Sequence, residues 1–264
     1  MDLGLTGKLA LVTGSTAGIG FATAAALARE GARVIINGRT GARVESAIVE
    51  LRKTVPQARI EGIAADMSTG AGCARIVAAH PAVDVLVNNM GIFEPKPFEE
   101  IADADWLRIF EANVLSGIRL ARHYVREMRA RNWGRIVFVS SESGVQIPVE
   151  MIHYGVTKTA QIAVARGLAE TLAGTNVTVN SVLPGPTGSE GAGRFVAQMA
   201  AASGKDAATI EREFLAVARP SSILKRFASP AEVASLITYV CSEAASATTG
   251  AALRVDGGVV RAIL

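Results

Sequence analysis

Short runs of consecutive apolar residues, rich in valine and isoleucine, recur along the chain between longer segments of helical period. Continuous rather than alternating hydrophobicity predicts strands buried on both faces, as in a parallel sheet covered by helices. The predicted strands span residues 9–13, 33–37, 60–65, 83–88, 135–140, 177–183 and 251–255. The pattern therefore predicts an α/β fold: a single doubly wound (Rossmann) domain of about seven parallel strands with helices on both faces.

Residues typical of helix starts support this alternation of strands and helices. Ser229, Pro230 and Glu232 supply an N-cap residue, a first-turn proline and a third-position acid, so a helix is predicted from there to about Ser242. No linker divides residues 1–264, which predicts one domain. The Gly/Ala/Ser-rich stretch 186–204 is expected to be a long functional loop, and 187–227 a lid over the substrate.

Composition narrows the function classes. The formal net charge of the 264 residues is +3, without a basic tail or an aromatic-basic patch, so no nucleic acid partner is expected. Cys73 and Cys241 are too few and too isolated to predict a disulfide framework or a metal site. The apolar run at 9–12 is too short for a signal peptide or a membrane span, which predicts a cytoplasmic protein without membrane attachment.

A glycine-rich stretch, TGSTAGIG at 13–20, follows the first predicted strand. Glycines at 14, 18 and 20 would let the backbone approach a pyrophosphate, and the next helix would offer free N–H groups and a partial positive charge. The spacing differs from G-x-G-x-x-G, so the stretch alone is compatible with dinucleotide binding or with a plain glycine-rich turn.

This stretch resembles the T-G-x-x-x-G-I-G motif of the short-chain dehydrogenase/reductase (SDR) family, and the resemblance extends over nearly the whole chain. The family's N-N-A-G motif is similar to NNMG at 88–91. Met90 departs from it, and its side chain would either crowd the cofactor's ribose or point into the core. The resemblance implies cofactor contacts, including an adenine contact by Asp66, at these positions: Gly14, Ser15, Thr16, Gly18, Ile19, Gly20, Asp66, Met67, Asn88 and Gly91.

The end of the second predicted strand bears on the choice of cofactor. NAD-preferring enzymes place an acid there, which binds the ribose 2′-hydroxyl and repels a 2′-phosphate. This chain has Gly38 followed by Arg39, and a guanidinium pairs well with phosphate. The sequence favours NADP(H) over NAD(H), the alternative being that Arg39 is an ordinary exposed residue.

Tyr154 and Lys158 lie four residues apart, on one face of a predicted helix. A lysine ammonium about 4 Å from the phenol would lower the tyrosine pKa by about 3 units. His153 points about 100° away from Tyr154 and is interpreted as a helix-start or pocket-wall residue.

The resemblance assigns roles to this pair and to residues around it. It implies that Tyr154 is the general acid/base and that Lys158 lowers its pKa and holds the nicotinamide ribose. It also implies that Ser141 donates a hydrogen bond to the reacting oxygen and that Asn113 holds a water linking Lys158 to solvent. The Pro-Gly motif after the sixth strand matches Pro184 and Gly185, and Thr187 is expected to contact the nicotinamide carboxamide.

The substrate is less defined. Residues 142–153 are expected to line its pocket, and apolar lid residues either line it too or pack the lid: Phe195, Val196, Met199, Ile210, Phe214 and Leu215. In general character the chain is similar to β-ketoacyl-ACP reductases. Separately, helical 3-4-3 spacing predicts a stripe of four arginines, at 119, 122, 126 and 129. Such a stripe could contact an acyl carrier protein, water or another subunit. Glu170 stands where the ketoacyl reductases carry a basic residue, which argues against carrier docking.

The sequence therefore predicts an NADP-dependent oxidoreductase, a carbonyl reductase or alcohol dehydrogenase acting on a small molecule and assembled as a homotetramer or homodimer. Two alternatives stay open. One is an NAD-dependent dehydrogenase of a sugar, steroid or other secondary alcohol. The other is a nucleotide-binding protein that has kept the fold without turnover.

Overall fold

A single seven-stranded sheet organises the computed structural model, which describes residues 2–263 apart from the side chains of residues 192, 194, 195, 198, 199 and 202. The strand order is β3-β2-β1-β4-β5-β6-β7, and every neighbouring pair is parallel. The strands are β1 (Leu9–Val12), β2 (Arg33–Gly38), β3 (Arg59–Ala64), β4 (Val85–Asn88), β5 (Gly134–Val139), β6 (Val177–Pro184) and β7 (Ala252–Val255). The predicted doubly wound fold is confirmed.

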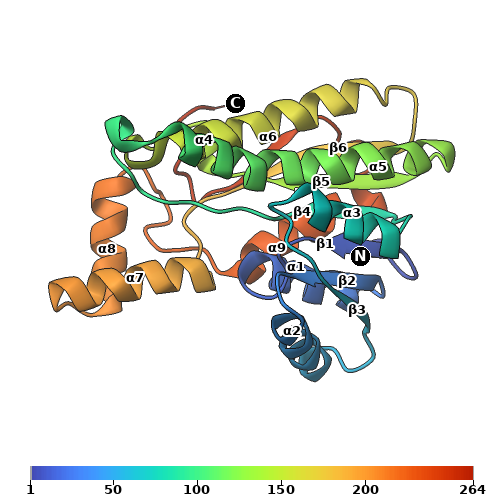
Figure 1. The fold of residues 1–264 in the computed structure, drawn as a ribbon, viewed down its shortest axis with the longest axis horizontal. Coiled ribbons are helices and arrows are strands. Elements are labelled where there is room, and N and C mark those ends of the chain that lie inside the picture. The colour runs from blue at the N-terminus through green and yellow to red at the C-terminus, as the bar shows by residue number, and fades with distance from the viewer. Residues whose placement is uncertain (1, 264) are drawn as a thin grey trace.

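Helices cover both faces of this sheet (Figure 1). One face carries α1 (Gly18–Arg29), α2 (Gly41–Thr54) and α9 (Pro230–Val240), and the other carries α3 (Gly70–Ala79), α5 (Ser116–Ala130) and α6 (Ile152–Glu170). Side chains along a strand alternate between the two cores: Ala10 and Val12 of β1 join the first, and Leu11 joins the second. Burial on both faces explains the continuous apolar runs.

The predicted cap of α9 is present. The Ser229 side chain accepts a hydrogen bond from the Glu232 N–H, and the Glu232 carboxylate accepts one from the Ser229 N–H, which completes a capping box. On another stretch, α4 (Asp103–Phe110) continues into α5 through a π-helical turn, η2 (Glu111–Leu115).

The prediction of a long loop over 186–204 was wrong for most of that stretch. It contains α7 (Glu190–Ser203), and α8 (Ala207–Ala218) follows it. Alanine has the highest helix propensity, and Val196 is buried, so the Ala-rich segment forms a helix despite its glycines. Phe195 and Met199, predicted to line a pocket or pack the lid, have side chains outside the described residues.

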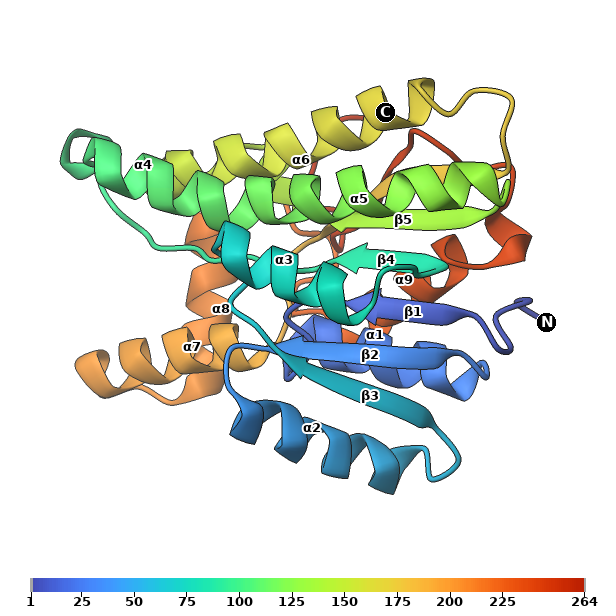
Figure 2. The ribbon, with the colours of Figure 1, turned by 45° about the vertical axis from the view of Figure 1, so that its right-hand side comes forward.

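The carboxyl ends of the strands lie on the side of the molecule where α7 and α8 project (Figure 2). The chain runs from β1 outward to β3 and then returns to place β4 beside β1. Ligands of doubly wound sheets bind at such a reversal. Among the described residues, no helix is long and apolar enough to cross a membrane.

Candidate active site

The glycine-rich stretch forms a tight turn between β1 and α1. Gly14 and Gly18 both have a φ of 58°, in the left-handed region that favours glycine. A Cβ on Gly20 would lie 2.6 Å from the Gly14 carbonyl oxygen, so only glycine fits that close approach. The N-cap residue of α1, Ala17, offers no side-chain cap, and the first turn of α1 holds no acid. This cradle fits a phosphate, which would accept from the free N–H groups.

Side chains from neighbouring strands hold this turn in place. The buried Ser15 hydroxyl donates to the Val12 carbonyl oxygen at 2.6 Å and accepts from the Asn37 N–H at 2.9 Å. Asn89 donates to the carbonyl oxygens of Thr13 and Gly14, at 3.0 and 3.1 Å. The Ser15 side chain therefore holds the loop in shape, and Asn37 and Asn89 are supports that the sequence analysis did not single out.

The adenosine end of the predicted cofactor site carries two arginines. Arg39 is exposed and directly follows Gly38. A Cβ on Gly38 would lie 2.5 Å from the Thr16 methyl carbon, so Gly38 leaves room for the glycine turn. Arg43, on the first turn of α2, forms an ion pair with Glu190 of α7 at 2.8 Å. A hollow of about 510 Å³ is lined by Thr16, Ala17, Phe21, Ala42, Arg43, Ser46, Ala47 and Glu50. Arg43 was not predicted, because its place beside the glycine turn depends on the packing of α2.

Asp66 and Met67, which follow β3, face different surroundings. Asp66 is exposed and accepts hydrogen bonds from the Ser68 N–H and hydroxyl, at 3.0 and 2.7 Å. These hydrogen bonds, and the charge of Arg39, hold the pKa of Asp66 below its ordinary value. The Met67 side chain is buried in the core, so only its backbone is available for the predicted contact. Ile19, also predicted, packs partly against the opposite core.

The residues of the NNMG segment (88–91) face different parts of the molecule. The Asn88 amide is buried, and its carbon lies 3.2 Å from where a Cβ on Gly117 would stand, so it faces α5 rather than the glycine turn. Met90 packs against the core, which favours the second of its two interpretations. A Cβ on Gly91 would lie 3.4 Å from Lys158 Nζ and 3.8 Å from Asn113 Oδ1. Gly91 therefore connects the cofactor end to the catalytic end.

The predicted catalytic residues converge beyond the end of β5. Ser141 follows that strand, and Tyr154 and Lys158 share one face of α6, with Lys158 Nζ 5.5 Å from the centre of the Tyr154 ring. Lys158 is buried and donates to the Val139 carbonyl oxygen at 2.9 Å and to Gln161 Oε1 at 3.0 Å.

The protonation equilibria differ from the expectation that Lys158 lowers the Tyr154 pKa. Burial, followed by the charge of Glu142, raises the pKa of Tyr154 above its ordinary value, although a hydrogen bond with Ser141 and the charge of Arg219 oppose this. Burial also lowers the pKa of Lys158 to about 7, opposed by Glu142. Lys158 is itself deprived of water, which disfavours the charged form that the expected effect on the Tyr154 pKa requires.

Asn113 lies in the π-helical turn η2, a distortion common at functional sites. Its amide donates to the Ile92 carbonyl oxygen at 2.9 Å and to the Thr157 hydroxyl at 3.0 Å. Its backbone carbonyl accepts from Gln161 Nε2 at 2.6 Å, and Gln161 Oε1 accepts from Lys158. Gln161 thus joins Lys158 to Asn113, and a polar side chain on the buried face of α6 is the sequence signal that could have revealed it.

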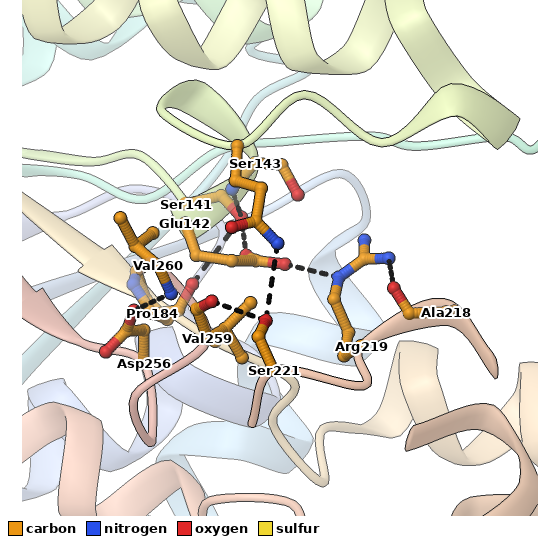
Figure 3. A network of polar contacts seen from close by, with 12 residues as sticks. Ser141, Glu142, Ser143, Pro184, Ala218, Arg219, Ser221, Asp256, Val259 and Val260 are labelled. Carbon is orange, nitrogen blue, oxygen red and sulfur yellow. Dashed lines mark hydrogen bonds and ion pairs between the residues drawn. The ribbon is translucent and has the colours of Figure 1, made fainter. Parts of the chain in front are cut away.

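A network of polar side chains lies behind Ser141 (Figure 3). The sequence placed Glu142 in the expected pocket-lining segment 142–153 but did not predict its pairing with Arg219. The Ser141 hydroxyl donates to the Glu142 carboxylate, and its oxygen accepts from the Ser143 N–H at 3.1 Å. Glu142 Oε1 accepts from Arg219 Nε at 2.8 Å, and Arg219 also pairs with Glu150 at 2.9 Å. The Glu142–Arg219 ion pair is buried, with side-chain exposures of 5% for Glu142 and 6% for Arg219.

The base of the lid is joined to the end of β6. Gly185 follows Pro184 and packs so closely on Asp256 that a Cβ would lie 2.5 Å from the Asp256 carbonyl oxygen. Thr187 forms an isolated parallel bridge with Ala228, and its hydroxyl donates to the Gly185 carbonyl oxygen at 2.9 Å. These contacts hold both ends of the segment 187–227 together at the sheet edge.

Other predicted pocket residues lie in packed surroundings. His153 is the second residue of α6, is buried, and stacks edge-on to Trp106 of α4 with ring centres 5.9 Å apart. Val196, Ile210 and Leu215 are buried within the lid, which favours lid packing over pocket lining for these three.

Comparison with known proteins agrees with this geometry. A family model described as short chain dehydrogenase matches residues 8–200. The chain is 45% identical to the uncharacterized oxidoreductase YvaG of Bacillus subtilis, over 100% of both chains. It is 34% identical to the 3-oxoacyl-(acyl-carrier-protein) reductase FabG of Aquifex aeolicus, over 98% of this chain and 100% of the relative.

Among solved structures, the L-sorbose reductase of Gluconobacter frateurii, complexed with NADPH and L-sorbose, matches with a TM-score of 0.92. The identity is 32%, and 100% of each chain is covered. Together with the family model and the geometry of the site, this shows that the chain belongs to the short chain dehydrogenase family and is an NAD(P)-dependent oxidoreductase.

Proposed function

We propose that the protein is an NADPH-dependent carbonyl reductase in which Tyr154 is the general acid, and the general base when a secondary alcohol is oxidised. The observation that carries this proposal is the convergence of Ser141, Tyr154 and Lys158 at the sheet edge that also bears the glycine turn.

Residues of this chain would hold the cofactor along that edge. The uncapped N-terminus of α1 suits the pyrophosphate, and Arg39 and Arg43 suit a 2′-phosphate. Lys158 and Thr187 would hold the nicotinamide half. A bound NADPH would supply the hydride, whose chemistry belongs to the cofactor.

The raised pKa of Tyr154 keeps its phenol protonated at neutral pH. A protonated phenol is the form that an acid needs when it protonates a ketone oxygen. Ser141 would donate a hydrogen bond to the same oxygen as charge develops on it. Tyr154 would therefore act as the acid when a ketone is reduced.

The substrate that suits this pocket is a small polar ketone bearing hydroxyl groups. Glu142 is the residue after the catalytic serine, and its buried ion pair with Arg219 would disfavour an apolar acyl chain beside it. Glu170, at the position where the ketoacyl reductases carry a basic residue, forms an ion pair with Arg166 on the exposed face of α6, which argues against docking of an acyl carrier protein through that position. The relative that binds L-sorbose supports a hydroxylated substrate.

NADPH oxidation by the purified protein tests this function. The assay would compare hydroxylated ketones such as L-sorbose with simple ketones and with a short β-ketoacyl thioester, each at matched concentration. We expect the highest kcat/KM with a hydroxylated ketone. A preference for the thioester would overturn the substrate class while leaving the reaction type in place.

Assembly and location complete the proposal. Exposed apolar side chains on α4, Leu107 at 72% and Phe110 at 38%, suit contact with a second copy of the chain. We propose a cytoplasmic homotetramer, or homodimer, built through α4, α5 and α6.

A further inference from the structure

The Ser141 hydroxyl carries one proton, and the Glu142 carboxylate is the nearer of its two acceptors in this structure, the other being the Pro184 carbonyl oxygen at 3.5 Å. A serine hydroxyl donates only one hydrogen bond at a time. Ser141 must therefore turn its proton away from Glu142 before it can donate to a substrate oxygen. The energetic cost of that turn depends on what else satisfies Glu142.

Arg219 supplies the other partner of Glu142. The guanidinium lies at the end of α8, and its Nε donates to Glu142 Oε1 while its Nη1 donates to Glu150 Oε1 and to the Ala218 carbonyl oxygen. Because the guanidinium stays on the carboxylate when the serine proton leaves, Glu142 is not left buried and unpaired, which is the costly outcome for a charge.

We propose that Glu142 is a positioning residue for Ser141, and that its ion pair with Arg219 lets the Ser141 hydroxyl turn to a substrate oxygen while the lid is seated on the domain. The lid is involved because Arg219 follows α8 directly, whereas Glu142 follows β5. This inference rests on the proposed carbonyl reductase function and adds a role for two residues outside the predicted set.

The charges around Tyr154 agree with the same arrangement. Three charged groups face Tyr154: Lys158 on the same helix, Glu142 in the turn after β5, and Arg219 at the end of α8. The uncharged Phe93 ring lies edge-on to the Tyr154 ring, with ring centres 6.1 Å apart. Glu142 raises the pKa of Tyr154 and Arg219 lowers it, so loss of the arginine alone would leave the carboxylate uncompensated near the phenol.

A double-mutant cycle in the NADPH oxidation assay tests the inference. Arg219→Gln should reduce kcat by about 10-fold or more, because it leaves Glu142 holding the serine proton without a counter-charge. Adding Glu142→Gln should restore most of that loss. If the double variant is no faster than Arg219→Gln, Arg219 does not act through Glu142 and the inference is overturned.

Glu61→Gln is the matched control, since it removes the carboxylate of another arginine ion pair, the exposed pair of Arg33 with Glu61 between β2 and β3. We expect less than about a twofold change in kcat for it, the size of a weak coupling. A loss as large as that of Arg219→Gln would mean that breaking any such ion pair slows the enzyme, against the inference. Thermal unfolding and NADPH fluorescence would select the variants that fold and bind.

A second readout needs no turnover. The ultraviolet absorbance of tyrosinate after a rapid pH jump, with Tyr154→Phe subtracted, should show the pKa of Tyr154 lowered in Glu142→Gln. An unchanged pKa would contradict the inference even if Arg219→Gln failed to fold. If the wild-type protein reduced no ketone, the proposed function would fail, while this titration would still test the arrangement of Glu142 and Tyr154.

Discussion

Lys158 is a buried amine whose surroundings shift its protonation. Its Nζ donates to the Val139 carbonyl oxygen and to Gln161, and burial lowers its pKa to about 7. The unfolded chain would protonate the same group up to a pH of about 10.4. Between these values the unfolded state binds more protons than the folded state, so folding stability should rise with pH.

Lys158→Met should therefore remove part of the pH dependence of stability. We expect the free energy of unfolding of the wild type to rise between about pH 7 and pH 9 relative to that of the variant, since the cost of burying the amine fades as the amine deprotonates. Urea unfolding at several pH values would measure the difference. Parallel stability curves for the two proteins over that range would contradict the assigned shift.

The two arginines beside the glycine turn determine cofactor choice in the proposed function. Arg39→Ala and Arg43→Ala should each raise the KM for NADPH roughly tenfold, because each removes a charge-assisted hydrogen bond to a phosphate, and should change the KM for NADH little. Arg52→Ala, an exposed arginine farther along α2, is the control. Equal changes in the KM for NADPH and for NADH would show that Arg39 is an ordinary surface residue.

At the scale of elements, helix ends and strand ends carry much of the organisation. The capping box at Ser229 fixes the start of α9, which buries Val233 and Ile237 in the core shared with α1. Part of the stability of that core therefore depends on one exposed serine.

Ser229→Ala should lower the free energy of unfolding by about 1 kcal/mol, because the N–H of Glu232 loses its acceptor. Ser235→Ala, at an exposed position within the same helix, should change it by less than about 0.5 kcal/mol. Chemical denaturation with circular dichroism measures both. A larger loss for Ser235→Ala than for Ser229→Ala would contradict the capping argument.

The strands were predicted from the sequence more accurately than the helices of the segment after β6. All seven strands were predicted within a few residues. Burial on both faces leaves an unbroken apolar run in the central strands, whereas the edge strands β3 and β7 are partly exposed. The Ala-rich helix α7 was mistaken for a loop, since glycine content and helix propensity compete in one segment. Ser141, Tyr154 and Lys158 were predicted through the spacing of the family's motif, whereas the pairing of Glu142 with Arg219, 77 positions apart, follows from tertiary packing alone.

At the scale of the whole molecule, the exposed surface of α4 and α5 is suited to assembly. Leu107 on α4 is 72% exposed, and Arg122 and Arg126 of α5 border a hollow of about 400 Å³ beside α3. In the proposed tetramer, the apolar part of this surface would be buried between copies, and exposed apolar surface of this kind commonly marks an interface.

Leu107→Asp should shift the protein toward smaller assemblies, because a carboxylate buried in an interface costs more than its lost apolar contact. Light scattering after size exclusion measures the mass of each species. Val49→Asp, at an exposed apolar position on α2, should leave the mass unchanged. An unaltered mass for Leu107→Asp would place the interface elsewhere or rule it out.

The central claim is that Tyr154 transfers the proton in an NADPH-dependent ketone reduction. Its most direct test is the rate of NADPH oxidation with a ketone that the wild type reduces, compared between wild type and Tyr154→Phe, with cofactor binding to both followed by fluorescence. We predict that Tyr154→Phe binds NADPH as tightly as the wild type and loses at least about 100-fold in kcat. A near-normal rate in a variant that binds NADPH would contradict the claim.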